Sequence, residues 1–184
     1  MSVQRRYTSA DLEAMPYVEG LRYEIIDGVL YVTSAPSFRH QRASNQLSTA
    51  LTNWSNDTGL GETFPTPGVI FSDDDNVIPD IVWISDDRLR TGSDSAGHLT
   101  VAPELVVEVL SPGSENEQRD REIKLGLYSR QRVQEYWLVD WRQRTVEVYR
   151  HDGRTLQRVA TLSGDVALTS PLLPGFSCPL RRLW

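Results

Sequence analysis

The sequence predicts an α/β protein in which helices pack on a mixed β-sheet, and three observations lead to this fold class. Apolar residues recur at helical spacing over residues 37–56. Two continuous apolar runs, at 105–110 and 135–140, flank a second predicted helix, which is typical of a strand–helix–strand unit with parallel strands. Asp27-Gly28 between two β-rich runs predicts an antiparallel hairpin. Both pairing directions are therefore expected.

The composition fits one globular domain over residues 1–184, because 39% of the 184 residues are hydrophobic and 24% are charged. No apolar run approaches the length of a membrane-spanning helix, so we expect a cytoplasmic protein without a membrane segment. One cysteine, Cys178, and three histidines exclude a Cys/His zinc framework. Oxygen atoms should therefore supply most ligands of any bound metal.

The charge balance is acidic, with 19 basic and 25 acidic residues and a net charge of -6. The field of the whole molecule should repel a polyanion, which counts against nucleic-acid binding without excluding it. Lys124 is the only lysine, since all other basic residues are arginine. A lysine ammonium is a compact charge with an adjustable pKa, so Lys124 is a candidate for a specific chemical role. A solvent-exposed helix lysine is the simpler alternative.

The N-terminal third should contain two helices and a hairpin. Thr8 and Asp11 have the spacing of a capping box, which predicts a short helix that ends before Pro16. The hairpin YEIIDGVLYV follows at 23–32. Residues 37–56 then form a long amphipathic helix that ends at two glycines.

The central segment should form a β-ribbon and the first apolar strand. Residues 62–71 and 77–85 are rich in β-forming residues and are separated by the polar turn SDDDN. Residues 85–103 are expected to be a loop. The run LVVEVL at 105–110 has the pattern of a strand covered on both faces.

The C-terminal third should complete the sheet. Ser114 and Glu117 have capping-box spacing and predict a helix through about Arg130. The apolar run EYWLVD follows as the second buried strand. Alternating residues around His151-Asp152-Gly153 predict a closing antiparallel hairpin. Its strands would be TVEVYR and TLQRVATL.

Two acidic residues interrupt the apolar strands. Asp80 shares a strand face with Val82 and Ile84, and Glu108 shares one with its apolar neighbours two residues away. If the two strands pair antiparallel, the start of one lies against the end of the other, about 5 Å apart. A buried carboxylate needs hydrogen bonds, a positive partner or a metal. A bound Mg²⁺ ion would satisfy both carboxylates.

The only lysine lies on the helix that follows Glu108. Asp120, Lys124 and Tyr128 are spaced four residues apart and should lie along one stripe of that helix. Ile123 and Leu127 form the neighbouring apolar stripe that faces the sheet, which leaves Lys124 at the edge of the buried face. From that edge, Lys124 could reach the two carboxylates.

Pro79-Asp80, Glu108 in an apolar strand and Lys124 resemble the PD-(D/E)XK nuclease superfamily, in the variant where the lysine has moved from the strand to the next helix. Similarity to the Uma-type restriction endonuclease family is more specific and covers roughly residues 8 to 180. It rests on the segments YEIIDGVLYVTSAPSFRHQ, VIPDIVWIS, APELVVEVLSPGS, RDREIKLGLYSRQRVQEYWLVD and LTSPLLPGF.

This resemblance implies a restriction-endonuclease-like αβββαβ core, with an added N-terminal helix and hairpin and a C-terminal β-hairpin. It also implies a Mg²⁺-dependent hydrolase of nucleic-acid phosphodiester bonds. Asp80 and Glu108 would bind the metal, and Lys124 would be the catalytic lysine that assists water attack. The departure from the standard pattern is Leu110, which stands where the strand motif has lysine. Only Lys124 can complete the triad.

Accessory candidates have weaker support. Glu24 matches an acidic position of the resembled family, or it lies on the polar face of an edge hairpin. His40 could bond to a phosphate or a metal-bound water, or it could cap the long helix. Asp120 and Tyr128 could hold Lys124 in position, although Asp120 and Lys124 also fit an ordinary helix ion pair. Gln41 is a weaker candidate than His40.

Other charged groups favour structural explanations. The run from Asp73 to Asp75 lacks the spacing of a calcium-binding loop, so a solvated turn is favoured. Four arginines bracket the lysine helix and could contact phosphates, but surface ion pairs explain them slightly better. These are Arg119, Arg121, Arg130 and Arg132. No nucleophile-elbow, P-loop or dinucleotide-binding motif is present.

The predicted function is a Mg²⁺-dependent endonuclease that cuts DNA, with Mn²⁺ as a possible replacement metal. A homodimer is expected, because two sites related by a two-fold axis suit the cutting of both strands of a duplex. RNA or a branched nucleic-acid end is the alternative substrate. The alternative outside enzymes is a catalytically silent nuclease fold that serves as a nucleic-acid or protein interaction module.

Overall fold

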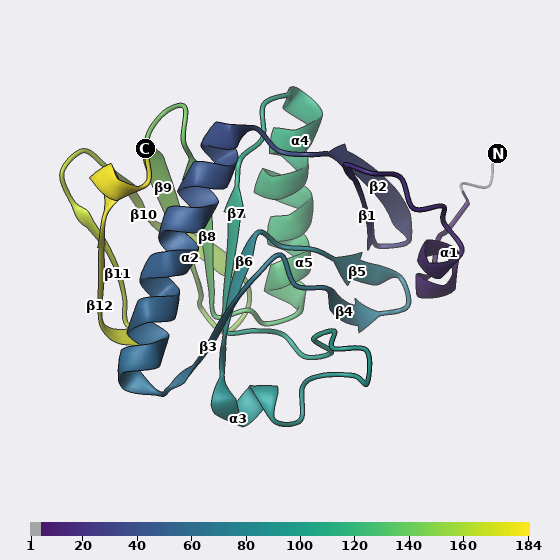
Figure 1. The fold of residues 1–184 in the computed structure, drawn as a ribbon, viewed down its shortest axis with the longest axis horizontal. Coiled ribbons are helices and arrows are strands. Elements are labelled where there is room, and N and C mark those ends of the chain that lie inside the picture. The colour runs from purple at the N-terminus through teal and green to yellow at the C-terminus, as the bar shows by residue number, and fades with distance from the viewer. Residues whose placement is uncertain (1–4) are drawn as a thin grey trace.

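The computed structural model describes residues 5–184 and has the mixed α/β architecture that the sequence predicts (Figure 1). Its centre is a six-stranded sheet in the order β10-β9-β8-β7-β6-β3. The strands are β3 Gly61–Pro65, β6 Ile81–Ser85, β7 Leu105–Val109, β8 Glu135–Asp140, β9 Thr145–His151 and β10 Leu156–Ser163. The pair β7 and β8 is parallel, which confirms the predicted strand–helix–strand unit.

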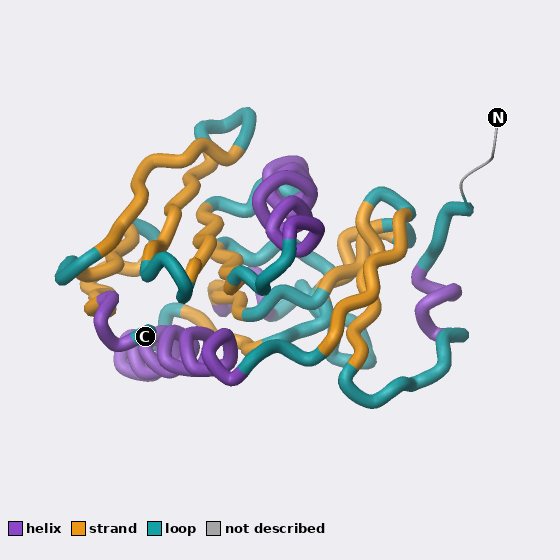
Figure 2. The backbone as a smooth tube through the Cα atoms, turned by 90° about the horizontal axis from the view of Figure 1, so that it is seen from above, coloured by secondary structure: helices purple, strands orange, loops and turns teal. Residues whose placement is uncertain are grey.

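Helices cover both faces of this sheet. Helix α2 (Phe38–Thr58) lies on one face, and a helix of three segments lies on the other (Figure 2). The three segments are α4 (Ser114–Gln118), the π-helical η1 (Arg119–Lys124) and α5 (Leu125–Arg130). Because side chains alternate along each strand, the sheet separates two apolar cores. Within residues 5–184, no helix combines the length and apolar character needed to cross a membrane.

A smaller four-stranded sheet, in the order β2-β1-β5-β4, lies beside the large one. It consists of β1 Leu21–Ile26, β2 Val29–Ser34, β4 Val69–Ser72 and β5 Asp75–Val77. The predicted hairpin is confirmed, since β1 and β2 pair antiparallel around Asp27 and Gly28. Both turn residues have positive φ, 52° and 74°, as a two-residue hairpin turn of the mirror-image type requires. Thr8 and Asp11 form the predicted capping box of α1 (Ser9–Glu13).

The predicted strands at 62–71 and 77–85 are wrong in one respect, because each is interrupted. The first breaks between Pro65 and Val69, and the second breaks between Val77 and Ile81. Pro79 lies in the second gap, and proline has no N–H group to donate to a strand ladder. The chain uses this break to pass from β5 of the small sheet to β6 of the large sheet. As a result, Asp80 lies at the junction between the two sheets.

The predictions for the loop at 85–103 and for the C-terminal segment also need correction. Residues 85–103 contain a single helical turn, α3 (Asp86–Leu89), within the expected loop. A two-stranded sheet follows the predicted hairpin and was not expected. It consists of β11 (Ala167–Ser170) and β12 (Leu173–Pro179). The chain then forms a short helical turn, η2 (Leu180–Arg182). The sheet packs on the α2 side through Leu168, Leu173 and Phe176, so its strands are defined by tertiary contacts rather than by a regular alternation along the sequence.

The helix after Pro112 also differs from the prediction. Its N-cap is Gly113, with φ 114°, and Ser114 is the first helical residue, so the expected Ser114–Glu117 capping box does not form. Gly113 suits this position because a side chain would be strained at that φ. The helix is continuous to Arg130, but its middle segment is π-helical rather than α-helical.

Candidate active site

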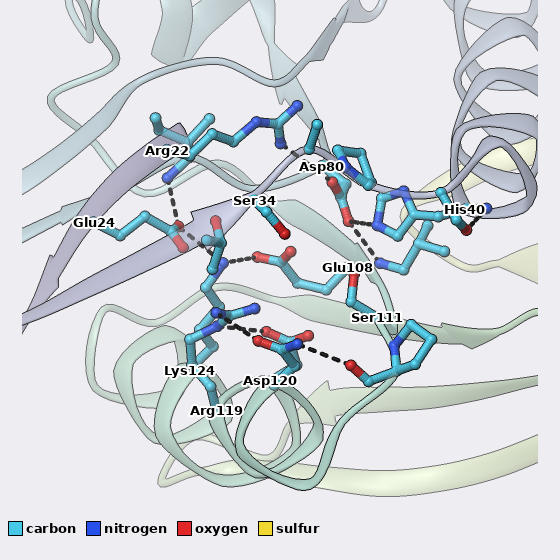
Figure 3. A pocket seen from close by; sticks show the side chains of 18 of the residues that line it. Arg22, Glu24, Ser34, His40, Asp80, Glu108, Ser111, Arg119, Asp120 and Lys124 are labelled. Carbon is cyan, nitrogen blue, oxygen red and sulfur yellow. Dashed lines mark hydrogen bonds and ion pairs between the residues drawn. The ribbon is translucent and has the colours of Figure 1, made fainter. Parts of the chain in front are cut away.

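A cavity of about 300 Å³ lies where the two sheets, the start of α2 and the η1 segment meet (Figure 3). Five elements supply its charged walls. Strand β1 contributes Arg22 and Glu24, and α2 contributes His40 from its first turn. The remaining charged residues are Asp80 before β6, Glu108 in β7, and Arg119, Asp120 and Lys124 in η1.

Asp80 and Glu108 lie on neighbouring strands of the large sheet. Strands β6 and β7 pair antiparallel with Ile81 opposite Val107, so Asp80, directly before β6, lies near the end of β7 that carries Glu108. The N–H group of Val109 donates to Oδ2 of Asp80 at 2.8 Å, which anchors the start of β6 to the end of β7. The sequence prediction therefore had the correct pairing direction and the correct face of the sheet.

Lys124 lies between two carboxylates from different sheets. Its Nζ atom is 2.9 Å from Oε1 of Glu108 and 2.9 Å from Oε1 of Glu24. Glu24 also accepts the N–H group of Ile78 at 2.8 Å, and Tyr128 donates its hydroxyl to Oε1 of Glu108 at 2.8 Å. Glu24 and Tyr128 thus help to fix Lys124 and Glu108.

The π-helical segment explains why Lys124 is more deeply buried than the sequence suggested. We expected Lys124 at the edge of the buried face, but only 2% of this residue is exposed, whereas Ile123 is only partly buried. A π turn holds more residues than an α turn, so it rotates the following side chains around the helix axis. The three residues that this segment contributes to the cavity are Arg119, Asp120 and Lys124.

His40 contacts the other face of Asp80. Its Nε2 atom lies 3.1 Å from Oδ2 of Asp80, and only 4% of the residue is exposed. Ser37 caps α2 by accepting the N–H group of His40, which fixes the first turn. The Nδ1 atom of His40 is buried and has no hydrogen-bond partner among residues 5–184. An unpaired buried polar atom reduces stability. The contact between Nε2 of His40 and Asp80 offsets part of that cost.

Asp120 is positioned by its neighbour rather than by a helix ion pair with Lys124. Its Oδ1 atom accepts a hydrogen bond from Nε of Arg119 at 3.2 Å, and its backbone carbonyl accepts the hydroxyl of Tyr136. Arg119 also donates from Nη1 to the side chain of Asn116 at 3.4 Å. No hydrogen bond or ion pair joins Asp120 to Lys124 in the described part of the chain.

The carboxylates have opposite pKa shifts. Burial raises the pKa of Glu108 to about 8, and Lys124 only partly opposes this, while Asp80, Asp120 and Glu24 raise the pKa further. Burial also acts to raise the pKa of Asp80, but the hydrogen bond and charge of His40 and the N–H group of Val109 outweigh it and lower that pKa. Asp80 is therefore ionised at neutral pH. Glu108 holds a proton more readily, and a bound divalent metal would displace that proton.

Lys124 is firmly protonated. Burial acts to lower the pKa of Lys124, but the negative charges of Glu108, Glu24 and Asp120 outweigh it and raise the pKa above its usual value. Burial, followed by the charge of Glu108, raises the pKa of Tyr128 well above its usual value. Both groups consequently act as hydrogen-bond donors, and neither can take a proton from water near neutral pH.

The donor atoms fit a small divalent cation. Asp80 accepts both of its hydrogen bonds at Oδ2, and Glu108 accepts both at Oε1, so one oxygen of each carboxylate is free of hydrogen bonds from residues 5–184. No three His, Cys, Asp or Glu side chains gather into a closed metal cage within that range. Mg²⁺ commonly takes only one or two protein carboxylates and completes its shell with water and phosphate oxygens.

Other sequence candidates lie outside the cavity. Arg121 pairs with Glu147, Arg130 pairs with Asp27, and Gln41 and Arg132 are exposed. Residues 73–75 lie at the β4–β5 turn, where Asp74 pairs with Arg6 and Asp75 accepts the N–H group of Asp27. These contacts agree with the structural explanations that the sequence favoured, with two corrections. Asp75 is buried at the start of β5 rather than solvated in the turn, and Arg119 is buried and lines the cavity rather than lying on the surface.

Arg22 is the charged cavity residue that sequence reasoning missed. It lies two residues before Glu24 on β1, so strand alternation places both on one face. That spacing was visible in the sequence, but the sequence did not reveal that β1 borders the cavity. Ser34, Ser111 and Asn116 also line the cavity and were not singled out.

Comparisons with known proteins agree with this fold. No curated protein matches the chain. A solved structure described as a putative nuclease belonging to DUF820, from Anabaena variabilis ATCC 29413, superposes with a TM-score of 0.76 at 18% sequence identity and covers 96% of each chain. Residues 9–181 match the family model Uma2, described as "Putative restriction endonuclease". The chain therefore belongs to the Uma2 family.

Proposed function

We propose that the protein is a divalent-metal-dependent nuclease that hydrolyses phosphodiester bonds of DNA. One observation carries the proposal: Lys124, the only lysine, lies 2.9 Å from Glu108, and the adjacent Val109 donates its N–H group to Asp80. The family description and the name of the structural relative agree with a nuclease. Two carboxylates with free oxygens beside a fixed cation suit phosphodiester hydrolysis.

The roles of the residues follow from their contacts. Asp80 and Glu108 would hold Mg²⁺ or Mn²⁺ through their free oxygens. A bound divalent metal would polarise the phosphate and lower the pKa of a water molecule. Lys124 would orient the attacking water and stabilise negative charge on the phosphate, since its raised pKa keeps it protonated. It is not the general base.

The surrounding residues would keep this arrangement rigid. Glu24 and Tyr128 fix Lys124 and Glu108 through hydrogen bonds, and His40 fixes Asp80. Groups held in this way need little rearrangement during the reaction, which is the principal source of electrostatic catalysis. Glu24, His40 and Tyr128 are therefore proposed as positioning residues.

Plasmid nicking tests the proposal directly. Purified protein is incubated with supercoiled DNA and Mg²⁺ or Mn²⁺, with and without chelator. The variants are Lys124→Met and a matched control, Arg121→Met, which removes a cation from the same helix but outside the cavity. We expect metal-dependent nicking by the wild type and by Arg121→Met, and none by folded Lys124→Met. Thermal melting checks that each variant is folded.

The other results are equally informative. Equal nicking by Lys124→Met would reject the proposed role of Lys124 or reveal a contaminating nuclease. If the wild type binds DNA or RNA but cuts neither with any divalent metal, the protein is instead a catalytically silent interaction module. If the protein cuts RNA but not DNA, the proposed hydrolysis mechanism is retained and the proposed substrate is wrong.

A homodimer is the second part of the proposal. Cutting both strands of a duplex is simplest when a two-fold axis relates two active sites. Light scattering after size-exclusion chromatography measures the mass of the protein in solution. A monomer at the concentration that linearises plasmid DNA would contradict the dimer and leave the proposed chemistry intact.

A further inference from the structure

Arg22 differs from the other cations of the cavity in how it is bonded. It projects from β1 on the same side as Glu24, and its side chain points toward Asp80 (Figure 3). The nearest acidic atom is Oδ1 of Asp80, at 3.8 Å from Nη1. This distance is too long for a hydrogen bond. Within residues 5–184, the Arg22 guanidinium makes no hydrogen bond.

The other two cations, Lys124 and Arg119, already have hydrogen-bond partners within the cavity. Lys124 is almost completely buried and is shared by Glu24 and Glu108. Arg119 donates to Asp120 and Asn116 and is 10% exposed at its side chain. The side chain of Arg22 is 31% exposed, so it can be reached from solvent. Arg22 is thus the most exposed of the three cations, and all of its guanidinium donors are free of hydrogen bonds within residues 5–184.

The available donors define the chemistry of that ligand. A guanidinium presents five N–H donors in a planar fork that matches the oxygen atoms of a phosphate group. The free Oδ1 atom of Asp80 lies beside it, where a metal-bound phosphate would also be held. A phosphate group bound by Arg22 would give the guanidinium its hydrogen-bond partners, and a divalent metal held at Asp80 would neutralise the carboxylate.

We propose that Arg22 binds the scissile phosphate group of a nucleic-acid strand in this cavity. The inference rests on the proposed function and names the residue that captures its substrate. Because the net charge of the chain is -6, strand binding must depend on a few local contacts rather than on the overall field. Arg22 should therefore account for a large share of the affinity.

Fluorescence anisotropy tests this assignment without requiring cleavage. A short labelled DNA oligonucleotide is titrated with protein in Ca²⁺ buffer at several KCl concentrations. The variants are Arg22→Gln, Arg22→Lys and the control Arg130→Gln, whose ion pair with Asp27 lies outside the cavity. Inorganic phosphate is added as a competitor in a second series. Melting curves confirm that the variants are folded.

We expect Arg22→Gln to weaken oligonucleotide binding about tenfold, as the loss of a charged phosphate contact should. The slope of log affinity against log salt should become shallower by about 0.7 to 0.9, the amount for one lost phosphate contact. Arg22→Lys should keep the slope but recover only part of the affinity, because it retains the charge without the fork. Arg130→Gln should bind like the wild type.

Two results would overturn the inference. Equal binding by Arg22→Gln and the wild type would show that Arg22 holds no phosphate, while the nicking assay would still decide the proposed function separately. If inorganic phosphate binds in an Arg22-dependent way but the oligonucleotide does not, the ligand is a small phosphate compound and the assignment to a nucleic-acid strand is wrong.

Discussion

Glu24 and Glu108 bind the same ammonium group, although they belong to different sheets. The Oε1 atom of each lies 2.9 Å from Nζ of Lys124. Lys124 therefore links the small sheet, the large sheet and the helix that packs on both. Breaking either contact leaves a buried charge without its full set of partners, which is costly in a low-dielectric interior. Four predictions follow from this arrangement and its neighbours.

Glu108→Gln should change how stability depends on pH in the metal-free protein. Burial raises the pKa of Glu108 from 4.5 to about 8, so the folded state holds a proton that the unfolded state has released between these values. The free energy of unfolding of the wild type should therefore decrease as pH rises through this window. Glutamine does not titrate, so the decrease should be smaller in the variant. Urea unfolding in chelator at several pH values measures both slopes.

The exposed Glu122→Gln variant is the control for this comparison. The dependence of its free energy of unfolding on pH should match that of the wild type. Identical slopes for Glu108→Gln and the wild type would contradict the raised pKa.

His40→Ala should weaken metal binding about 10- to 100-fold, because groups that orient a metal ligand commonly contribute this much. Removing the imidazole takes away the hydrogen bond and charge that lower the pKa of Asp80. Calorimetric titration with Mn²⁺ measures the affinity, with exposed Gln41→Ala as the adjacent control. Unchanged metal affinity in His40→Ala would show that His40 does not orient a metal ligand.

Glu24→Gln should destabilise the protein by about 3 kcal/mol, since removing one member of a buried ion pair leaves its partner undercompensated. The affected partner is Lys124, which then has only Glu108 within 2.9 Å. Chemical unfolding measures the loss, and Glu19→Gln on the exposed surface should show almost none. A loss equal to that of Glu19→Gln would mean that Glu24 does not hold Lys124.

Tyr128→Phe should reduce the free energy of unfolding by about 0.5 to 1.5 kcal/mol, the usual net contribution of an intramolecular hydrogen bond, because the raised pKa keeps Glu108 largely protonated at neutral pH. The change deletes a 2.8 Å hydrogen bond to Glu108 and leaves the packed ring in place. Tyr17→Phe is the control, because Tyr17 is 90% exposed. Denaturant titration of both variants gives the comparison, and equal stability would argue against the bond to Glu108.

Local sequence patterns predicted much of the fold. The apolar run around Glu108 predicted a buried strand, and the strand–helix–strand spacing predicted its parallel neighbour. Asp27-Gly28 predicted the hairpin because few residues adopt the positive φ values of its turn. The short strands β11 and β12 escaped prediction because they are stabilised by packing on the α2 side rather than by a local pattern.

The sequence pointed to two parts of the candidate site. Alternation along the strands assigned Asp80 and Glu108 to one face, and we expected them to lie close together only if their strands pair antiparallel, as β6 and β7 do. The unique lysine drew attention to Lys124. The full burial of Lys124 did not follow, because the helical spacing assumed an α-helix and the π turn rotates the side chain.

The sequence by itself determined which side chains could perform chemistry and which strand faces carry them, because residue identity and local periodicity are properties of short segments. Only the tertiary structure decided that Glu24 and Arg22 border the same cavity as Lys124. Strand β1 belongs to a separate sheet, and packing between distant segments sets its position beside the π-helical turn. Such packing depends on contacts that no local pattern encodes.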